Sequence, residues 1–400
     1  MNTEFEHCIR CTLCVENCPV FRVDKDYPGP KQAGPDAARF RADNEAPVDE
    51  WVRKCAQCKR CDVACPYGVN PSELIQEAQV RYSEQHGKGL AATLFSRNYY
   101  LGLLGSLFAP VSNAVTGNKG MKKLFRALGI STYMTFPRFH FHTLSRSWQK
   151  KGKGKRKVVF FHGCYLDNNS PDLGRSMTGL LADLGIRVKV PKQVCCGVPA
   201  LANGDLKLAK RFAAKNASIL AGYIDRGYDV VYACTSCGNA LTQEYPGVLD
   251  PPEGKKIAEN TYDIHEYILM LMEAGEIKPD FAPVKKRVAY HIPCHLRSMG
   301  IGYPAAKLLR MIPGLTLQIH DDNCCGLSGS YGFKTTFEDN ATHLGRIAGE
   351  AILERNPDLL ISDCGACRMQ LKHFTALSTM DPTELLRLSL SNKPCPSLTH

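Results

Sequence analysis

Three features that would narrow the class of this protein are missing from its sequence. The opening residues, "MNTEFEHCIRCTLC", contain no basic stretch followed by an apolar run, so no secretory leader is predicted. The sequence contains no convincing fingerprint for a flavin or nicotinamide, because "GIGYPA" at 300–305 follows a cysteine rather than a strand. No motif of a known nucleic-acid-binding fold occurs either, and we expect no nucleic-acid partner.

Acidic residues are absent from residues 85–166, although the chain contains 39 Asp and Glu. The same segment has fourteen Lys and Arg, so it carries the whole basic excess of a chain with a formal net charge of +11. Aromatic and aliphatic residues are interleaved with the basic ones, which is typical of a segment at an anionic membrane surface. The residues for which we predict membrane contact are Lys119, Lys122, Lys123, Arg126, Lys150, Lys151, Lys153, Lys155, Arg156 and Lys157.

The basic segment also has a simpler interpretation, as a linker packed on the acidic surface of this chain or of a partner. Its most apolar part, residues 98–115, is interrupted by Gly, Ser, Pro and Asn. A membrane-spanning helix needs about 20 predominantly apolar residues, so this part is too short and too broken to cross. We therefore expect peripheral membrane contact.

Cysteine is abundant, with 19 residues gathered in clusters. In a long chain without a leader, clustered thiols favour metal binding in a reducing cytoplasm over disulfide formation. Two N-terminal runs have the spacing C-x2-C-x2-C-x3-C-P, which is typical of ferredoxin-type [4Fe–4S] clusters. Structural zinc is the alternative, but zinc motifs usually consist of two separated C-x2-C pairs. The runs comprise Cys8, Cys11, Cys14 and Cys18, and then Cys55, Cys58, Cys61 and Cys65.

Ten further cysteines form two sets about 130 residues apart, which predicts two copies of one domain. Each set has the order C…CCG…C-x2-C, and each cysteine group follows an apolar, strand-like run. Helical patterns alternate with these runs, which predicts parallel sheets whose carboxyl ends gather the thiols. We name the sets CCG site 1, with Cys164, Cys195, Cys196, Cys234 and Cys237, and CCG site 2, with Cys294, Cys324, Cys325, Cys364 and Cys367.

Paired cysteines followed by glycine indicate an unusual metal centre. Neighbouring thiolates can occupy adjacent coordination positions, and a following glycine lets the backbone approach the metal. Five soft ligands exceed the needs of four-coordinate zinc, so an iron–sulfur centre is favoured. His162, His291 and His295 flank these cysteines and could tune a cluster through hydrogen bonds to its ligands, but simple packing is the favoured interpretation of all three.

These motifs resemble known iron–sulfur proteins. The N-terminal runs are similar to two-cluster ferredoxins, in which the fourth cysteine of each run ligates the other cluster. The resemblance implies one [4Fe–4S] cluster on Cys8, Cys11, Cys14 and Cys65 (cluster 1), and a second on Cys55, Cys58, Cys61 and Cys18 (cluster 2). The CCG sets resemble the cysteine-rich domain found in the B subunit of heterodisulfide reductase and in the iron–sulfur subunits of glycolate and lactate oxidation systems. That family implies non-cubane [4Fe–4S] clusters, or zinc at one site.

The order of the whole chain is similar to the iron–sulfur subunits of anaerobic glycerol-3-phosphate dehydrogenases. This resemblance implies an electron-transfer subunit of a glycerol-3-phosphate:quinone oxidoreductase, with no catalytic residue of its own. It implies two partner flavoprotein dehydrogenase subunits (the A and B subunits of the complex), the menaquinone pool, and a peripheral position at the cytoplasmic face of the inner membrane. The alternative is that a CCG centre itself reduces a disulfide or quinone.

The predicted fold class is an α+β multidomain chain with a helical ferredoxin module and two repeated α/β domains with parallel sheets. The predicted domains are residues 1–85 for the ferredoxin-type part, 86–156 for the basic segment, 157–280 for the first cysteine-rich repeat, and 281–400 for the second.

Overall fold

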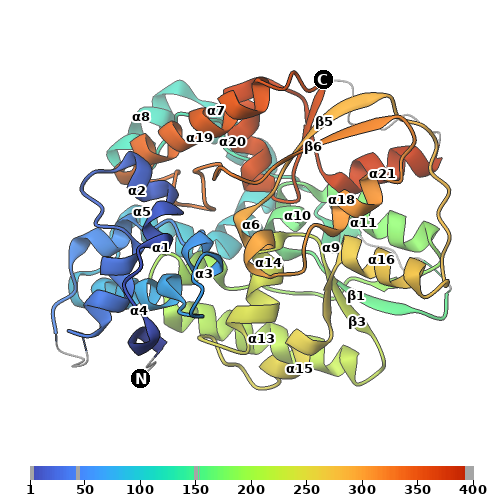
Figure 1. Ribbon diagram of the computed structural model, residues 1–400. Helices are drawn as coiled ribbons and strands as arrows, with labels where there is room; N and C mark the ends of the chain where they lie inside the picture. The colour runs from blue at the N-terminus through green and yellow to red at the C-terminus, as the bar shows by residue number, and fades with distance from the viewer. Residues whose placement is uncertain (1–3, 42–45, 148–151, 153, 392–400) are drawn as a thin grey trace.

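The computed structural model describes residues 4–41, 46–147, 152 and 154–391 (Figure 1). The N-terminal module is helical and contains no strand among its described residues. Its elements are η1 (Glu4–His7), α1 (Leu13–Glu16), α2 (Pro19–Val23), η2 (Gln32–Asp36), η3 (Glu50–Lys54), α3 (Arg60–Val63) and α4 (Pro71–His86).

Five helices make up the basic segment where the structure describes it: α5 (Leu90–Ser96), α6 (Asn98–Leu107), α7 (Ala109–Gly117), α8 (Lys119–Ala127) and α9 (Leu144–Ser147). Across the described part of the chain, every helix is too short or too polar to cross a membrane.

The two repeats fold alike, each with a four-stranded parallel sheet of the same strand order. The first repeat contains β1 (Lys157–Phe161), α10 (Gly163–Asn168), α11 (Pro171–Asp183), β2 (Arg187–Lys189), α12 (Val198–Leu201), α13 (Leu206–Ile224), β3 (Asp229–Tyr232), α14 (Thr235–Asn239), η4 (Ala240–Glu244), α15 (Gly254–Glu259), β4 (Thr261–Asp263) and α16 (Ile264–Glu273). The second contains β5 (Lys286–His291), α17 (Cys294–Ser298), α18 (Pro304–Leu309), β6 (Leu315–His320), η5 (Thr335–Phe337), α19 (Glu338–Leu353), β7 (Leu359–Ile361), α20 (Gly365–Thr375), β8 (Thr379–Met380) and α21 (Pro382–Ser391). The sheet orders are β2-β1-β3-β4 and β6-β5-β7-β8.

The structure confirms the predicted fold class of a helical module followed by two parallel-sheet repeats. All six runs predicted to precede a cysteine group contain strands, namely β1, β2, β3, β5, β6 and β7. The edge strands β4 and β8 escaped sequence analysis, because they are two or three residues long and no cysteine follows them. The domain limits stay predictions.

One hydrophobic core joins the two repeats. It runs from Val158 and Phe160 of β1 to Val288 and Tyr290 of β5 without a break. Helices α11, α16, α18 and α21 pack on one another and lie between the sheets (Figure 1). Each sheet therefore has one face on this shared core and the other on a core of its own, which contains the CCG thiols.

A buried polar bridge also crosses between the repeats. His265 of α16 contacts Thr383 of α21, with 3.0 Å between Nε2 and Oγ1. Its Nδ1 lies 3.3 Å from an oxygen of Asp263 and 3.5 Å from one of Asp363. Burial alone would lower the pKa of His265, but these two carboxylates together with that of Asp381 outweigh burial and raise this pKa from 6.5 to about 9. The imidazole is therefore cationic at neutral pH.

We expect this bridge to make stability depend on pH. A pKa raised in the folded state contributes stability that is complete below pH 6.5 and is lost as the pH rises through about 9. The full contribution is on the order of 3–4 kcal/mol, because each tenfold change in proton affinity corresponds to about 1.4 kcal/mol. Thermal unfolding of His265→Gln beside the unaltered protein should show a Tm difference that is largest near pH 6 and narrows above pH 9. A constant difference would contradict this assignment.

Candidate metal centres

The four thiols assigned to cluster 1 line one cavity at the surface of the N-terminal module. Cys8, Cys11, Cys14 and Cys65 face this cavity, and Cys11 is exposed. Burial and, after it, the neighbouring Cys8, Cys11 and Cys65 raise the pKa of Cys14 to about 11. Cys65 thus lies with the first cysteine run although it belongs to the second. The ligand set of cluster 1 stays a prediction, and these thiols lie together as it requires.

The four thiols assigned to cluster 2 are more deeply placed. Cys18, Cys58 and Cys61 are buried, and Cys55 is half-buried. Burial raises the pKa of Cys55 to about 12, and the nearby Cys18 thiol raises it as well. Burial likewise raises the pKa of Cys61, with contributions from Cys55 and Cys18. Cys18 therefore lies with the second cysteine run although it belongs to the first, just as Cys65 lies with the first run although it belongs to the second.

Both cysteine runs share one unusual backbone conformation. Arg10 and Gln57 occupy matching positions and have φ values of 62° and 52°. The next matching pair, Thr12 and Lys59, has φ values of 68° and 56°. Left-handed conformations are uncommon for residues other than glycine and persist where the surroundings impose them. Their recurrence at both sites fits loops shaped to wrap a cluster, since such turns direct successive backbone N–H groups toward an anionic centre.

Each CCG set brings its five thiols into one connected group. In the first repeat, hydrogen bonding to Cys164 and Cys196 raises the pKa of Cys195, and burial adds to the shift. Hydrogen bonding to Cys196 and Cys234 raises the pKa of Cys237 in the same way. The order of contact is therefore first cysteine, paired cysteines, then the C-x2-C pair. CCG site 1 is thus one connected group of thiols that includes the cysteines following β1 and β3.

CCG site 2 repeats this arrangement. Cys324 contacts Cys294 and Cys325, and the Cys367 and Cys325 sulfurs lie 3.3 Å apart. The pattern of burial also matches, because the paired cysteines and the last cysteine of each set are buried while the other two are half-buried. The predicted CCG residues therefore come together in both repeats, and their assignment as metal ligands stays a prediction.

The structure gives a packing reason for the glycine after each cysteine pair. Gly197 and Gly326 have φ values of 104° and 84°, which favour glycine. A Cβ on Gly326 would lie 2.5 Å from the carbonyl oxygen of Ala341 in α19, so this glycine admits a helix. The expected approach of the backbone to a metal at these glycines stays a prediction. Close approach to a thiol also occurs at Gly163, whose Cβ would lie 2.7 Å from the Cys237 sulfur.

The two CCG sites face each other across the repeat interface. His295, which follows Cys294, has its Nδ1 3.0 Å from the Ser236 hydroxyl, within the C-x2-C turn of CCG site 1. Tyr165 holds the matching position after Cys164, and its ring packs on Gly365 in the C-x2-C turn of CCG site 2. Each repeat therefore contributes a side chain that lies against the CCG site of the other.

The N-terminal module meets CCG site 2 directly. Hydrogen bonding to Cys294 is the main reason that the pKa of Cys58 is raised, so a cluster 2 thiol contacts a CCG site 2 thiol. Beside this contact, Arg60 donates to the carbonyl oxygens of Asp321 and Asp322, at 3.0 and 2.7 Å. Ser328 donates to the carbonyl of Ala56. These bonds hold the two thiol groups against each other.

The thiol groups fit iron–sulfur clusters. All eighteen cysteines in the described residues are free, and desolvation opposes ionisation of most of them. Many thiols gathered in a dry site are poorly stable as anions unless metal cations accompany them. Soft thiolate donors select iron–sulfur clusters, zinc or Cu(I), and iron–sulfur clusters, when bound, accept and release single electrons.

The basic residues predicted to contact a membrane divide into three groups. Lys119, Lys123 and Lys155 are exposed, and Lys122 is half-buried. Arg126 pairs with Glu338, Arg156 pairs with Glu276, and Lys157 donates to the carbonyl of Arg226, so these three contact the chain itself. Lys150, Lys151 and Lys153 lie outside the described residues.

A two-cluster module joined to twin cysteine-rich domains defines a class of iron–sulfur electron-transfer subunits. The 4Fe-4S dicluster domain model matches residues 4–69, and the cysteine-rich domain model matches residues 158–242 and 288–372. The C subunit of anaerobic glycerol-3-phosphate dehydrogenase from Escherichia coli is 35% identical over 98% of this chain and 100% of its own length. The chain belongs to the family of these C subunits.

Two further relatives match most of this chain at lower identity. The B subunit of fumarate reductase (CoM/CoB) from Methanothermobacter marburgensis is 28% identical over 91% of this chain and 67% of its own length. The D subunit of dihydromethanophenazine:CoB–CoM heterodisulfide reductase from Methanosarcina barkeri is 25% identical over 92% of this chain and 88% of its own length. The resemblance inferred from the motifs is confirmed, and an electron-transfer role follows at the level of the class.

Sequence analysis favoured packing for one side chain that could bind a metal directly. His291 lies with Cys325 and Cys367 in a group whose possible ligand atoms are all within 4.8 Å of one another. Its position at the end of a strand, three residues before Cys294, was visible in the sequence. Its proximity to the Cys325 and Cys367 sulfurs required the folded chain.

Replacing one cysteine of either CCG pair should remove one centre and spare the others. We expect Cys196→Ser to abolish the electron paramagnetic resonance signal of CCG site 1, and Cys325→Ser that of CCG site 2, because each thiol touches two others in its group. Iron content should fall by one cluster while the N-terminal signals persist. Cys395→Ser, the cysteine outside every motif, is the control. Unchanged spectra in both pair variants would refute the ligand assignment.

Proposed function

We propose that this chain is the iron–sulfur electron-transfer and membrane-contacting subunit of an anaerobic glycerol-3-phosphate dehydrogenase complex. Partner flavoprotein subunits would deliver electrons to its N-terminal clusters, and the electrons would pass to menaquinone in the cytoplasmic membrane. Identity to the Escherichia coli relative over that protein's full length supports the choice of substrate system. The contact between Cys58 and Cys294 carries the electron-transfer part of the proposal.

The order of the thiol groups supports a direction for the electrons. Cluster 1 includes the exposed Cys11 and opens at the surface, where a partner can reach it. Cluster 2 lies deeper, and its Cys58 contacts Cys294 of CCG site 2. We infer that electrons enter at cluster 1, pass to cluster 2, and reach the CCG centres last. Two [4Fe–4S] clusters and two non-cubane clusters would provide this series.

The absence of a flavin fingerprint from this sequence fits such a division of labour. A flavin gives up two electrons, whereas each cluster takes one at a time. Several clusters on one subunit would therefore accept both electrons of a reduced flavin in succession.

Membrane contact is supported chiefly by an apolar surface on α6 and α7. We call it the α6–α7 face: Leu101, Leu103, Leu104, Leu107, Phe108, Val111 and Val115, all of which are exposed. The opposite side of α6 packs on the protein through small residues. A Cβ on Gly105 would lie 2.6 Å from the ring of Phe139, and Ser106 donates to Asn168 over 3.0 Å. The small side chains hold α6 close, so its leucines point outward.

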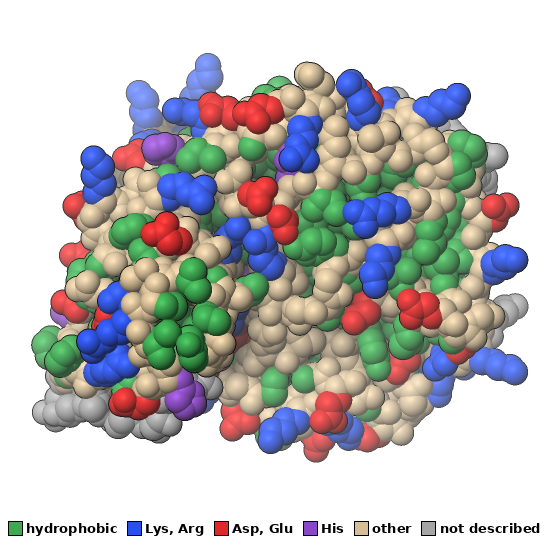
Figure 2. All heavy atoms as spheres, viewed as in Figure 1, with side chains coloured by type: hydrophobic (Ala, Val, Ile, Leu, Met, Phe, Trp, Pro, Cys, Tyr) green, Lys and Arg blue, Asp and Glu red, His purple; other side chains and the backbone are tan. Residues whose placement is uncertain are grey.

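An exposed apolar surface of this kind marks an interaction site or a membrane contact. The exposed Lys119 and Lys123 of α8 follow it, and each basic residue near an anionic leaflet contributes about 1 kcal/mol. On the side of the molecule that Figure 2 shows, basic and acidic side chains are intermixed. We infer that apolar insertion of the α6–α7 face, assisted by these lysines, provides the membrane contact.

The electron route can be tested with the full chain and its flavoprotein partners under anaerobic conditions. Glycerol 3-phosphate should reduce the N-terminal clusters first and a CCG centre afterwards. Freeze-quench electron paramagnetic resonance measures the order in which the signals appear. Arg60→Ala should slow only the second step, severalfold, because Arg60 holds the loop that precedes the paired cysteines of CCG site 2. Arg53→Ala, which removes an exposed ion pair with Glu50 in the same module, is the matched control.

Lactate and glycolate serve as substrate controls in this experiment. Reduction by either of them in place of glycerol 3-phosphate would overturn the proposed substrate system. Catalysis at a CCG centre is the second candidate function, favoured by the way the two sites face each other. Disulfide reduction by the chemically reduced chain without a flavoprotein would support that candidate.

The membrane proposal predicts a defined loss of vesicle binding. The combined change Leu104→Asp, Phe108→Asp and Val111→Asp should weaken binding to anionic phospholipid vesicles by roughly tenfold or more, since each apolar side chain contributes about 1.5–3 kcal/mol when buried. A sedimentation assay measures the bound fraction. Met311→Asp with Leu353→Asp, two exposed apolar residues outside the α6–α7 face, is the control. Equal losses in both variants, or no loss in the first, would contradict the proposal.

A further inference from the structure

The two CCG sites differ at one position that faces the thiols. The last residue of β1, three residues before Cys164, is Phe161. The matching last residue of β5, three residues before Cys294, is His291. Both side chains are almost completely buried. At this matched position the repeat thus offers a side chain without a donor atom in the first domain and an imidazole in the second.

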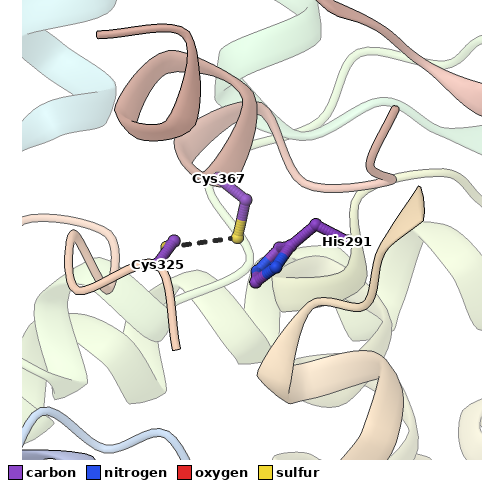
Figure 3. Close-up of side chains that lie close together, drawn as sticks. All are labelled: His291, Cys325 and Cys367. Carbon is purple, nitrogen blue, oxygen red and sulfur yellow. Dashed lines mark hydrogen bonds between the residues drawn. The ribbon is translucent and has the colours of Figure 1, made fainter. Parts of the chain in front are cut away.

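The His291 ring lies among the thiols of CCG site 2. Figure 3 shows it beside the Cys367 and Cys325 sulfurs, with each side chain coming from a different element. His291 ends β5, Cys325 belongs to the paired-cysteine loop, and Cys367 lies in α20. The possible ligand atoms of all three lie within 4.8 Å of one another, whereas ligand atoms around one metal ion are roughly 3–4 Å apart. A small adjustment would bring all three to one metal.

The imidazole has an unused nitrogen. Nε2 of His291 is buried and has no hydrogen-bond partner among the described residues. A buried polar atom without a partner destabilises a fold, and such atoms in native proteins often serve a bound group. Imidazole is a common ligand of iron and zinc, and it binds through either ring nitrogen.

We propose that His291 is a nitrogen ligand of the metal centre at CCG site 2, so that this centre is bound by thiolates and an imidazole while CCG site 1 is bound by thiolates alone. The inference rests on the proposed function in one respect, that CCG site 2 holds a metal centre. It adds a ligand outside the cysteine motif and makes the two centres chemically distinct.

A mixed ligand set has a consequence for electron flow. A neutral imidazole in place of a thiolate leaves a cluster less negative, and histidine ligation raises the reduction potential of [2Fe–2S] centres in this way. CCG site 2, which adjoins cluster 2 through Cys58 and Cys294, is then the more readily reduced CCG centre. Electrons leaving the N-terminal module would therefore collect at CCG site 2 in preference to CCG site 1.

The test is a spectroscopic search for a histidine nitrogen in the anaerobically purified full chain. The protein is produced with ordinary and with ¹⁵N-labelled histidine, and hyperfine spectra are recorded on the CCG signals. We expect a strong nitrogen coupling on one CCG signal that changes with the label, disappears in His291→Phe, and persists in His320→Phe. His320 is the matched control, because it is a buried histidine paired with His291 in the β5–β6 register.

A second variant covers the case in which His291→Phe fails to assemble CCG site 2. His291→Cys restores a ligand as a thiolate, so iron content should be retained and the potential of one CCG centre should fall while the other three stay unchanged. An unchanged potential in His291→Cys would overturn the proposal. So would a labelled, fully iron-loaded protein with no strong histidine coupling, or a coupling that persists in His291→Phe.

Metal analysis separates this inference from the proposed function. A chain without iron at any site would refute the electron-transfer proposal itself, whereas four iron–sulfur centres without histidine coupling would refute only the role of His291. If CCG site 2 contains zinc, zinc-edge absorption replaces the hyperfine measurement. A nitrogen neighbour at about 2.0 Å that His291→Phe removes would then support the proposal, and an all-sulfur shell would overturn it.

Discussion

The structure depends on the packing of many thiols into small, water-poor groups. Ten of the eighteen described cysteines are buried, and in both CCG sites the thiols contact one another. Burial disfavours the charged form of a thiol, and neighbouring thiolates repel one another. Such a group is stable as thiolates when metal cations balance its charge. Sulfur atoms are brought together by the ends of the strands, by the left-handed loop residues and by the glycines at which a Cβ would clash.

Because the domain is repeated, the chain gathers thiols in this way twice, and CCG site 1 and CCG site 2 face each other. The residue after the first cysteine of each repeat contacts the C-x2-C turn of the other, through His295 with Ser236 and Tyr165 with Gly365. The shared core and the His265 bridge fix the repeats in this relation. The N-terminal module contacts the two sites differently: its Cys58 thiol contacts Cys294 of CCG site 2, whereas Val80 of α4 packs in the core that contains thiols of CCG site 1. A pseudosymmetric pair of domains thereby acquires an asymmetric connection.

In the folded chain, the basic and the apolar residues of the basic segment have different surroundings. Arg126, Arg156 and Lys157 contact the chain itself, as the linker interpretation expected. The apolar residues of the α6–α7 face, in contrast, are exposed because glycine and serine occupy the inner side of α6. Helical packing therefore separates two roles that are mixed along the sequence. Some of the basic side chains of this segment bind groups of the same chain, whereas the apolar side chains of the α6–α7 face stay on the surface.

Local spacing was sufficient to predict the cysteine motifs, the repeat, six of the eight strands and the fold class. These features depend on residues close in sequence, or on a comparison of two segments of the same chain. The sequence could not show that Cys58 meets Cys294, that His291 lies beside Cys325 and Cys367 while Phe161 occupies the matching place, or which leucines stay exposed. Each of these relations joins elements separated by tens to hundreds of residues. The packing of helices and sheets determines them, and no single segment encodes that packing.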